Sequence, residues 1–87
     1  MASYRLEWRK STKKDLRQIA PIEVERIVRA ANDLAINPFP LNCKKLANST
    51  RAYRVRVGDY RIIYEVFSDV LIVEVVRIAH RGKVYGN

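Results

Sequence analysis

The chain is poor in the residues that build metal sites and disulfides. Its 87 residues include one cysteine, Cys43, and one histidine, His80. A lone cysteine cannot form an internal disulfide, which fits a reduced, cytoplasmic protein with Cys43 as a small packed residue. One cysteine and one histidine do not make a zinc site. We therefore expect no metal and no cofactor.

Long apolar runs and acidic residues are also scarce. No run approaches the roughly 18 apolar residues of a membrane-spanning helix, and charged residues interrupt the N-terminus, so no signal peptide is visible. Lys and Arg total 17 against 9 Asp and Glu, a formal charge of +8 that is spread over both halves of the chain. Such a charge indicates that the partner is nucleic acid or an acidic protein. A membrane is the weakest of the candidate partners.

Residues 52–67 (AYRVRVGDYRIIYEVF) are the most informative stretch. Apolar and arginine residues alternate before a Gly-Asp pair, and a second β-forming run follows, which predicts two strands joined by a type II′ turn. On one face this register puts Arg56 opposite Arg61, with Arg54 one pair further. The other face is apolar and pairs Val57 with Tyr60, Val55 with Ile62, and Tyr53 with Tyr64.

Three arginines on one strand face are the feature that points to a function. Like charges directly opposite each other destabilise a sheet, so we expect this face to bind a polyanion. The alternative is a solvated face on which the arginine stems cover apolar surface.

The first half of the chain predicts one strand and two helices. Tyr4–Trp8 alternates as a short strand, and a basic helix over 12–19 follows, capped by Ser11 or Thr12. A second helix begins at Pro21, and the two helices are expected to form a hairpin against one sheet face. Its core-facing stripe has helical spacing: Val24, Ile27, Val28, Ala31, Leu34 and Ala35.

The second half predicts a connection and more strands. Residues 42–50 have no clear period, 67–70 predict a tight turn, and the nearly all-apolar run 70–78 predicts a central or near-central strand covered on both faces. Residues 1–87 are thus expected to form one α+β domain, with an N-terminal strand, a helical hairpin and an antiparallel β-meander. Three cations around the connection extend the basic surface or line a solvated loop: Lys44, Lys45 and Arg51.

The C-terminal segment supplies further candidate site residues. If the second turn has two residues and the last strand is straight, Ile78 and His80 share the face of Arg61, while the side of Arg81 stays open. Cations beside a histidine and a tyrosine, with no carboxylate pair, suit phosphate chemistry. The candidates in this segment are His80, Arg81, Lys83 and Tyr85.

RNA is a suitable substrate for such a set because it carries its own nucleophile, the 2′-OH. Cleavage without metal then needs a proton acceptor for the 2′-OH and a donor for the leaving 5′-oxygen. Histidine suits either role, although a lone His80 is more often structural. Tyr85 serves if nearby cations favour its ionised form, or it stacks on a base.

The chain resembles the bacterial RelE toxins of the RelE/ParE superfamily. The resemblance rests on YRVRVGDYRIIY (residues 53–64), RIAHRGKVY (residues 77–85) and the order strand, two helices, strands. It implies a toxin of a type II toxin–antitoxin pair that enters the ribosomal A site and cuts the mRNA codon there, leaving a 2′,3′-cyclic phosphate. It also implies a RelB-like, acidic antitoxin as partner, and operator DNA bound through that antitoxin.

The resemblance also implies roles for individual residues. Arg61 matches the family arginine that stabilises the scissile phosphate. Arg81 matches the arginine that contacts phosphate or protonates the leaving group. Tyr85 matches the tyrosine that stacks on or activates the substrate. Arg54 and Arg56 stand where well-known members carry lysines. Arginine cannot lose its proton in a protein, so the base is another residue, or catalysis rests on orientation and electrostatics alone.

Two other functions stay open from the sequence. A ParE-like toxin would inhibit DNA gyrase on the same fold without cutting RNA. An RNA-binding module would use the basic face without chemistry.

Overall fold

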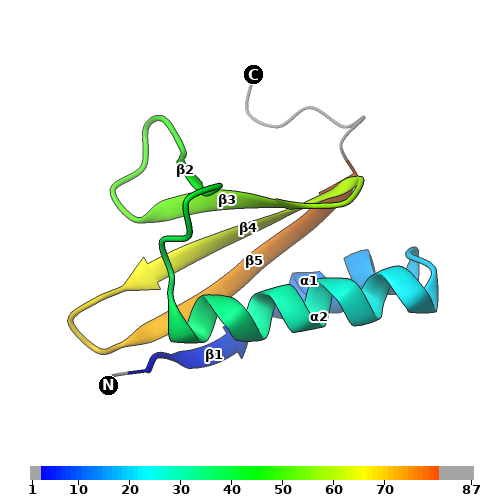
Figure 1. Ribbon diagram of the computed structural model, residues 1–87, viewed down its shortest axis with the longest axis horizontal. Helices are drawn as coiled ribbons and strands as arrows, with labels where there is room; N and C mark the ends of the chain where they lie inside the picture. The colour runs from blue at the N-terminus through cyan, green and yellow to red at the C-terminus, as the bar shows by residue number, and fades with distance from the viewer. Residues whose placement is uncertain (1–2, 81–87) are drawn as a thin grey trace.

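The computed structural model describes residues 3–80, which form one sheet and two helices. In chain order the elements are β1 (Arg5–Trp8), α1 (Lys10–Arg17), α2 (Pro21–Ile36), β2 (Lys44–Lys45), β3 (Ala52–Val57), β4 (Tyr60–Phe67) and β5 (Ile72–His80). The five strands lie in the order β1-β5-β4-β3-β2, with β1 parallel to β5 and the other neighbours antiparallel (Figure 1). In this part of the chain, neither helix combines the length and apolar character needed to cross a bilayer.

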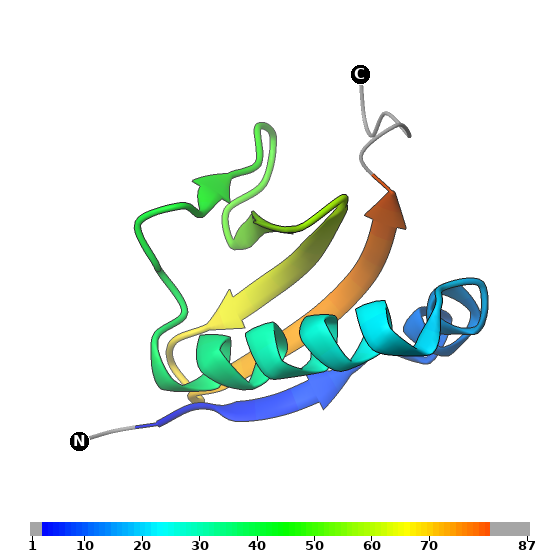
Figure 2. The ribbon, with the colours of Figure 1, turned by 45° about the vertical axis from the view of Figure 1, so that its right-hand side comes forward.

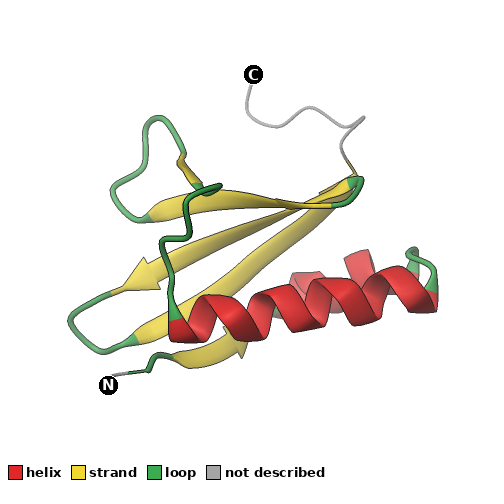
Figure 3. Cartoon of the chain, viewed as in Figure 1, coloured by secondary structure: helices red, strands yellow, loops and turns green. Residues whose placement is uncertain are grey.

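Both helices lie on the same side of the sheet, as Figure 2 and Figure 3 show. We call this the helix-facing side and the opposite side the open face. The arrangement confirms the predicted α+β class with a meander of β3, β4 and β5.

The helix starts show one correct and one wrong prediction. Pro21 begins α2, as expected, and the side chains of Ile27, Ala31 and Leu34 are buried against the sheet. No side chain caps α1, which begins earlier than predicted, after Arg9. The Thr12 hydroxyl instead donates a hydrogen bond to the Arg9 carbonyl inside the first turn, so it is not available as a cap.

The core lies between α2 and the helix-facing side of β3, β4 and β5. Tyr64 is fully buried there, and its hydroxyl donates a 2.7 Å hydrogen bond to the carbonyl of Pro38. Burial raises the pKa of Tyr64 well above its ordinary range. This bond ties the chain after α2 to the sheet, because Pro38 lies two residues beyond the end of the helix.

Three details of the strands differ from the predictions. The connection 42–50 contains the two-residue strand β2, which pairs with Arg54 and Tyr53 of β3. The connection between β4 and β5 has four residues, 68–71, and Leu71 adopts a φ of 56°. Finally, β5 is an interior strand as expected, but helices cover only one of its faces.

A β-bulge changes which residues of β5 face which side. Ile63 pairs with Arg77 and Tyr64 with Val75, which leaves Val76 as an extra residue. Lengthening a turn by two residues keeps each side chain on its face, whereas one bulged residue moves all that follow to the other face. The predicted face of Ile78 and His80 is therefore wrong.

Candidate nucleic-acid interface

The β3–β4 hairpin has the register that the alternation predicts. Val55 pairs with Ile62 on the helix-facing side, and Arg56 pairs with Arg61 on the open face. Gly58 has a φ of 59°, whereas Asp59 does not have a positive φ. A positive φ at the first central residue alone is the requirement of a type II′ turn.

A basic hollow lies on the open face over β2, β3 and β4. Its volume is about 340 Å³. The strand β2 contributes to it because Lys44 pairs with Arg54, which places another cation beside the arginines. The residues that line it are Asn42, Lys44, Arg54, Arg56 and Arg61.

The cations of this basic hollow are not neutralised by carboxylates of residues 3–80. The ion pairs among those residues involve Arg5, Arg9 and Arg26, none of which lines the hollow. Arg56 is oriented instead by a 3.0 Å hydrogen bond from its Nε to the Gly58 carbonyl in the turn. Like charges therefore stand together without internal compensation, which suits a bound phosphate.

The other half of the open face carries acidic residues that are paired with arginines. Glu7, Glu74 and Glu65 lie side by side on β1, β5 and β4 and form an acidic row. Arg9 forms ion pairs with two members of this row, and its Nη2 lies 2.9 Å from Glu74 Oε1 and 3.5 Å from Glu65 Oε1. The hydrogen bond to Glu74 raises the pKa of Arg9. Here the charges are paired within the fold.

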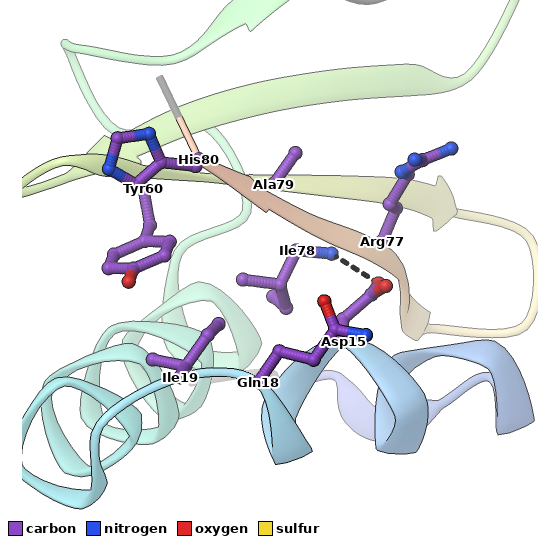
Figure 4. Close-up of a pocket in the computed structure, with 8 residues that line it drawn as sticks. All are labelled: Asp15, Gln18, Ile19, Tyr60, Arg77, Ile78, Ala79 and His80. Carbon is purple, nitrogen blue, oxygen red and sulfur yellow. Dashed lines mark hydrogen bonds between the residues drawn. The ribbon is translucent and has the colours of Figure 1, made fainter. Parts of the chain in front are cut away.

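His80 does not join the basic hollow. It pairs with Tyr60 on the helix-facing side, while Ala79 takes the place beside Arg61. The rings of His80 and Tyr60 meet edge to face with centroids 5.2 Å apart. Figure 4 shows His80 and Tyr60 in a separate pocket that also receives Gln18 of the α1 end.

The remaining predicted site residues lie away from the basic hollow or outside the residues that the structure describes. The guanidinium carbon of Arg51 stands 4.7 Å from the centre of the Phe67 ring, at the other end of the hairpin from the turn. Lys45 pairs with Tyr53 and does not line the hollow. Three predicted site residues lie outside the described residues: Arg81, Lys83 and Tyr85.

One cation of the open face was missed from the sequence. The bulge turns Arg77 onto the open face, opposite Ile63 and in line with Arg54. The sequence does carry a signal for it. Glu74 and Arg77 are three positions apart, so a regular strand would turn one of these charges toward the helices, and one extra residue between them puts both on the open face. Within residues 3–80 no group of three His, Cys, Asp or Glu side chains could hold a metal ion. The described part of the site is thus a set of guanidinium and ammonium donors.

Comparison with known proteins identifies the family. The chain matches the family described as ParE toxin of type II toxin-antitoxin system, parDE, over residues 6–85. The chain belongs to this toxin family. The RelE1 protein of Methanocaldococcus jannaschii is 31% identical over 97% of this chain and 97% of its own length.

Solved structures agree with this assignment. The archaeal RelE–RelB complex from Pyrococcus horikoshii matches with a TM-score of 0.81 and 26% identity, covering 95% of this chain and 100% of that one. The toxin–antitoxin complex RelBE2 from Mycobacterium tuberculosis matches with a TM-score of 0.83 and 25% identity, covering 95% and 97%. The protein is therefore a RelE-like toxin of a type II toxin–antitoxin system, as the resemblance implied.

Proposed function

We propose that this toxin is a ribosome-dependent mRNA endonuclease that cuts the codon in the A site without a metal ion. The observation that carries the proposal is the basic hollow, in which Arg54, Arg56 and Arg61 converge without internal carboxylate partners among residues 3–80. The RelE names of its relatives support the same reaction.

The proposed reaction is a transesterification within the RNA. The 2′-oxygen forms a bond to the adjacent phosphorus, the bond from phosphorus to the 5′-oxygen breaks, and a 2′,3′-cyclic phosphate results. The 2′-OH gives its proton to a base, and the leaving 5′-oxygen gains one. Arg61, with Arg54 and Arg56, stabilises the negative charge that builds on the non-bridging oxygens.

Proton transfer and orientation complete the proposal. The proposed residues for proton transfer or phosphate contact are Tyr85, Arg81 and His80. His80 can take this role only for a substrate that extends past the end of β5. Lys44, Lys45, Arg51 and Lys83 are proposed RNA contacts. The ribosome supplies the alignment of the 2′-OH with the phosphate, since orientation alone accounts for several kcal/mol of a barrier.

The proposed regulator is a cognate RelB-like antitoxin with an acidic segment. Such a segment would cover the basic hollow and neutralise it. RelE chains in the Pyrococcus horikoshii and Methanococcus jannaschii structures are in complex with RelB. We further propose that the complex binds operator DNA through the antitoxin, and that the toxin acts in the cytoplasm, where ribosomes translate.

The proposal is tested by primer extension on a defined mRNA, with and without programmed ribosomes. Wild-type toxin should cut within the A-site codon only when ribosomes are present. Arg61→Gln should reduce the cleavage rate by about 10²–10³, the usual loss for one donor that stabilises a developing charge. Arg29→Gln, which removes an exposed arginine on α2, is the matched control and should cut at the wild-type rate.

A ParE-like activity is the second candidate, because the matched family is described as ParE toxin. Folded toxin that leaves mRNA intact but blocks supercoiling by gyrase would establish it and exclude the nuclease. Salt-sensitive RNA binding with neither activity would indicate a binding module.

A further inference from the structure

A second hollow with cations lies between α1 and the part of the β5 edge that follows the segment paired with β1. Its volume is about 450 Å³. It shares no lining residue with the basic hollow of β2, β3 and β4, so a group bound here occupies a separate site. The residues that line it are Ser11, Lys14, Asp15, Gln18, Val76 and Arg77.

The hollow is built by the way α1 closes the edge of β5. Among residues 3–80, the strand β1 pairs with Ile72–Val75 and no further along β5. Beyond it, Ser11 Oγ donates a 3.2 Å hydrogen bond to the Val76 carbonyl, and Asp15 Oδ2 accepts a 3.0 Å hydrogen bond from the Ile78 N–H. These bonds hold one face of α1 against the edge, and Lys14 lies on that face, three residues after Ser11.

The β-bulge brings the second cation to this site. Arg77 is exposed and points away from the helices, whereas Asp15 lies on the helix side of the strand (Figure 4). Without the extra residue Val76, Arg77 would face the helices. The bulge thus places a guanidinium between the α1 edge and the arginines of the basic hollow.

The charge at this site is positive. Asp15 is the one carboxylate that lines it, and one of its oxygens already accepts the Ile78 N–H. Neither Lys14 nor Arg77 takes part in the ion pairs found among residues 3–80. Three more exposed cations of α1 add to the field: Lys10, Lys13 and Arg17.

We propose that Lys14 and Arg77 bind the RNA backbone at an anchoring site separate from the scissile phosphate. Arginine holds a phosphate through two donors and lysine acts as a point charge, while Ser11 and Gln18 add polar groups. The strands β3 and β5 lie roughly 10 Å apart at two strand spacings, so Arg54 and Arg77 serve different stretches of backbone. This inference rests on the proposed function and assigns the RNA a second contact.

The test separates anchoring from chemistry. Half-saturating toxin concentration and saturating cleavage rate are measured on programmed ribosomes for wild type, Arg77→Gln, Lys14→Gln and the Arg29→Gln control. Arg77→Gln should raise the half-saturating concentration roughly tenfold, the loss of one charged hydrogen-bonded contact, and change the saturating rate far less. Arg61→Gln should show the opposite split. Circular dichroism of each variant verifies that it is folded.

A binding measurement keeps the inference testable if no cleavage occurs. Affinity for free mRNA, empty ribosomes and programmed ribosomes is measured at several salt concentrations, and Arg77→Gln should reduce the slope of log affinity against log salt by about one. A loss on empty ribosomes assigns the backbone to ribosomal RNA, and a loss only with mRNA assigns it to the message. Variants that match Arg29→Gln in affinity and slope, or that lose only the saturating rate, would overturn the anchoring site.

Discussion

The two faces of the β3–β4 hairpin carry opposite kinds of residue on the same backbone. Arg61 and Ile62 are neighbours in the chain, yet Ile62 is fully buried beneath α2 and Arg61 lines the basic hollow. The helix-facing side stabilises the fold by burying apolar surface. The open face collects like charges that contribute no stability to the fold. The alternation of side chains along a single strand thus separates the residues that stabilise the fold from those that we propose to bind RNA.

The open face shows the same contrast within itself. Arg9 pairs with Glu65 and Glu74 of the acidic row and Arg5 pairs with Glu7, whereas the cations of the basic hollow have no carboxylate partner among residues 3–80. Within residues 3–80 the charges of the acidic row are paired, and the charges that we propose for RNA binding are not.

The largest expected effect on stability comes from the buried neighbour of Arg61. Ile62→Ala should lower the free energy of unfolding by about 2–5 kcal/mol, since it removes buried methyl groups and leaves a cavity. The measurement is urea unfolding, with Arg61→Gln as the adjacent comparison. Arg61→Gln should stay within about 0.5 kcal/mol of wild type. Equal losses for both variants would contradict the assignment of the two faces.

The free energy of unfolding should also decrease at alkaline pH because of Tyr64 on the helix-facing side. Because burial raises its pKa in the folded state, the unfolded chain loses this proton first, near pH 10. Stability from Tyr64 is therefore complete below about pH 10 and falls above it, by at most about 1.4 kcal/mol per pH unit.

Tyr64→Phe tests this by urea unfolding between pH 8 and pH 11. At pH 8 the variant should lose about 1 kcal/mol with the hydrogen bond to Pro38, and above pH 10 its stability should fall less steeply than that of wild type. Identical slopes for the two proteins would show that Tyr64 is not the group responsible.

The smallest expected effect is on the acidic row. Arg9→Gln should cost on the order of 0.5–1 kcal/mol, because the Arg9 side chain is 43% exposed and solvent screens its ion pairs. The loss should shrink in 1 M salt, where the Debye length is about 3 Å. Arg5→Gln is the control, since its pair with Glu7 is more exposed and should contribute less. A larger loss for Arg5→Gln would show that Arg9 does not neutralise the row.

Local pattern was sufficient for the hairpin and for α2. Strict alternation around a Gly-Asp pair admits one register, which is why the pairing of Arg56 with Arg61 was predicted correctly. The start of α2 at Pro21 followed from a residue that needs no N–H partner there. The positive charge followed from composition alone, and the anionic partner that this charge indicates stays a prediction.

Other features depend on contacts between distant segments. β2 is two lysines long, and only pairing with β3 makes it a strand. The closing of the β5 edge by Ser11 and Asp15 joins residues more than 60 positions apart.

The bulge at Val76 is the clearest case. The run from residue 72 to 76 is largely β-branched, so its pattern does not reveal where an extra residue sits, and only packing on both sides of β5 decides it. That one residue moves His80 away from the face of Arg61 and brings Arg77 onto it. The alternation of side chains determined which residues could share a face, and the tertiary structure determined which of them do, because a strand's register depends on its neighbours.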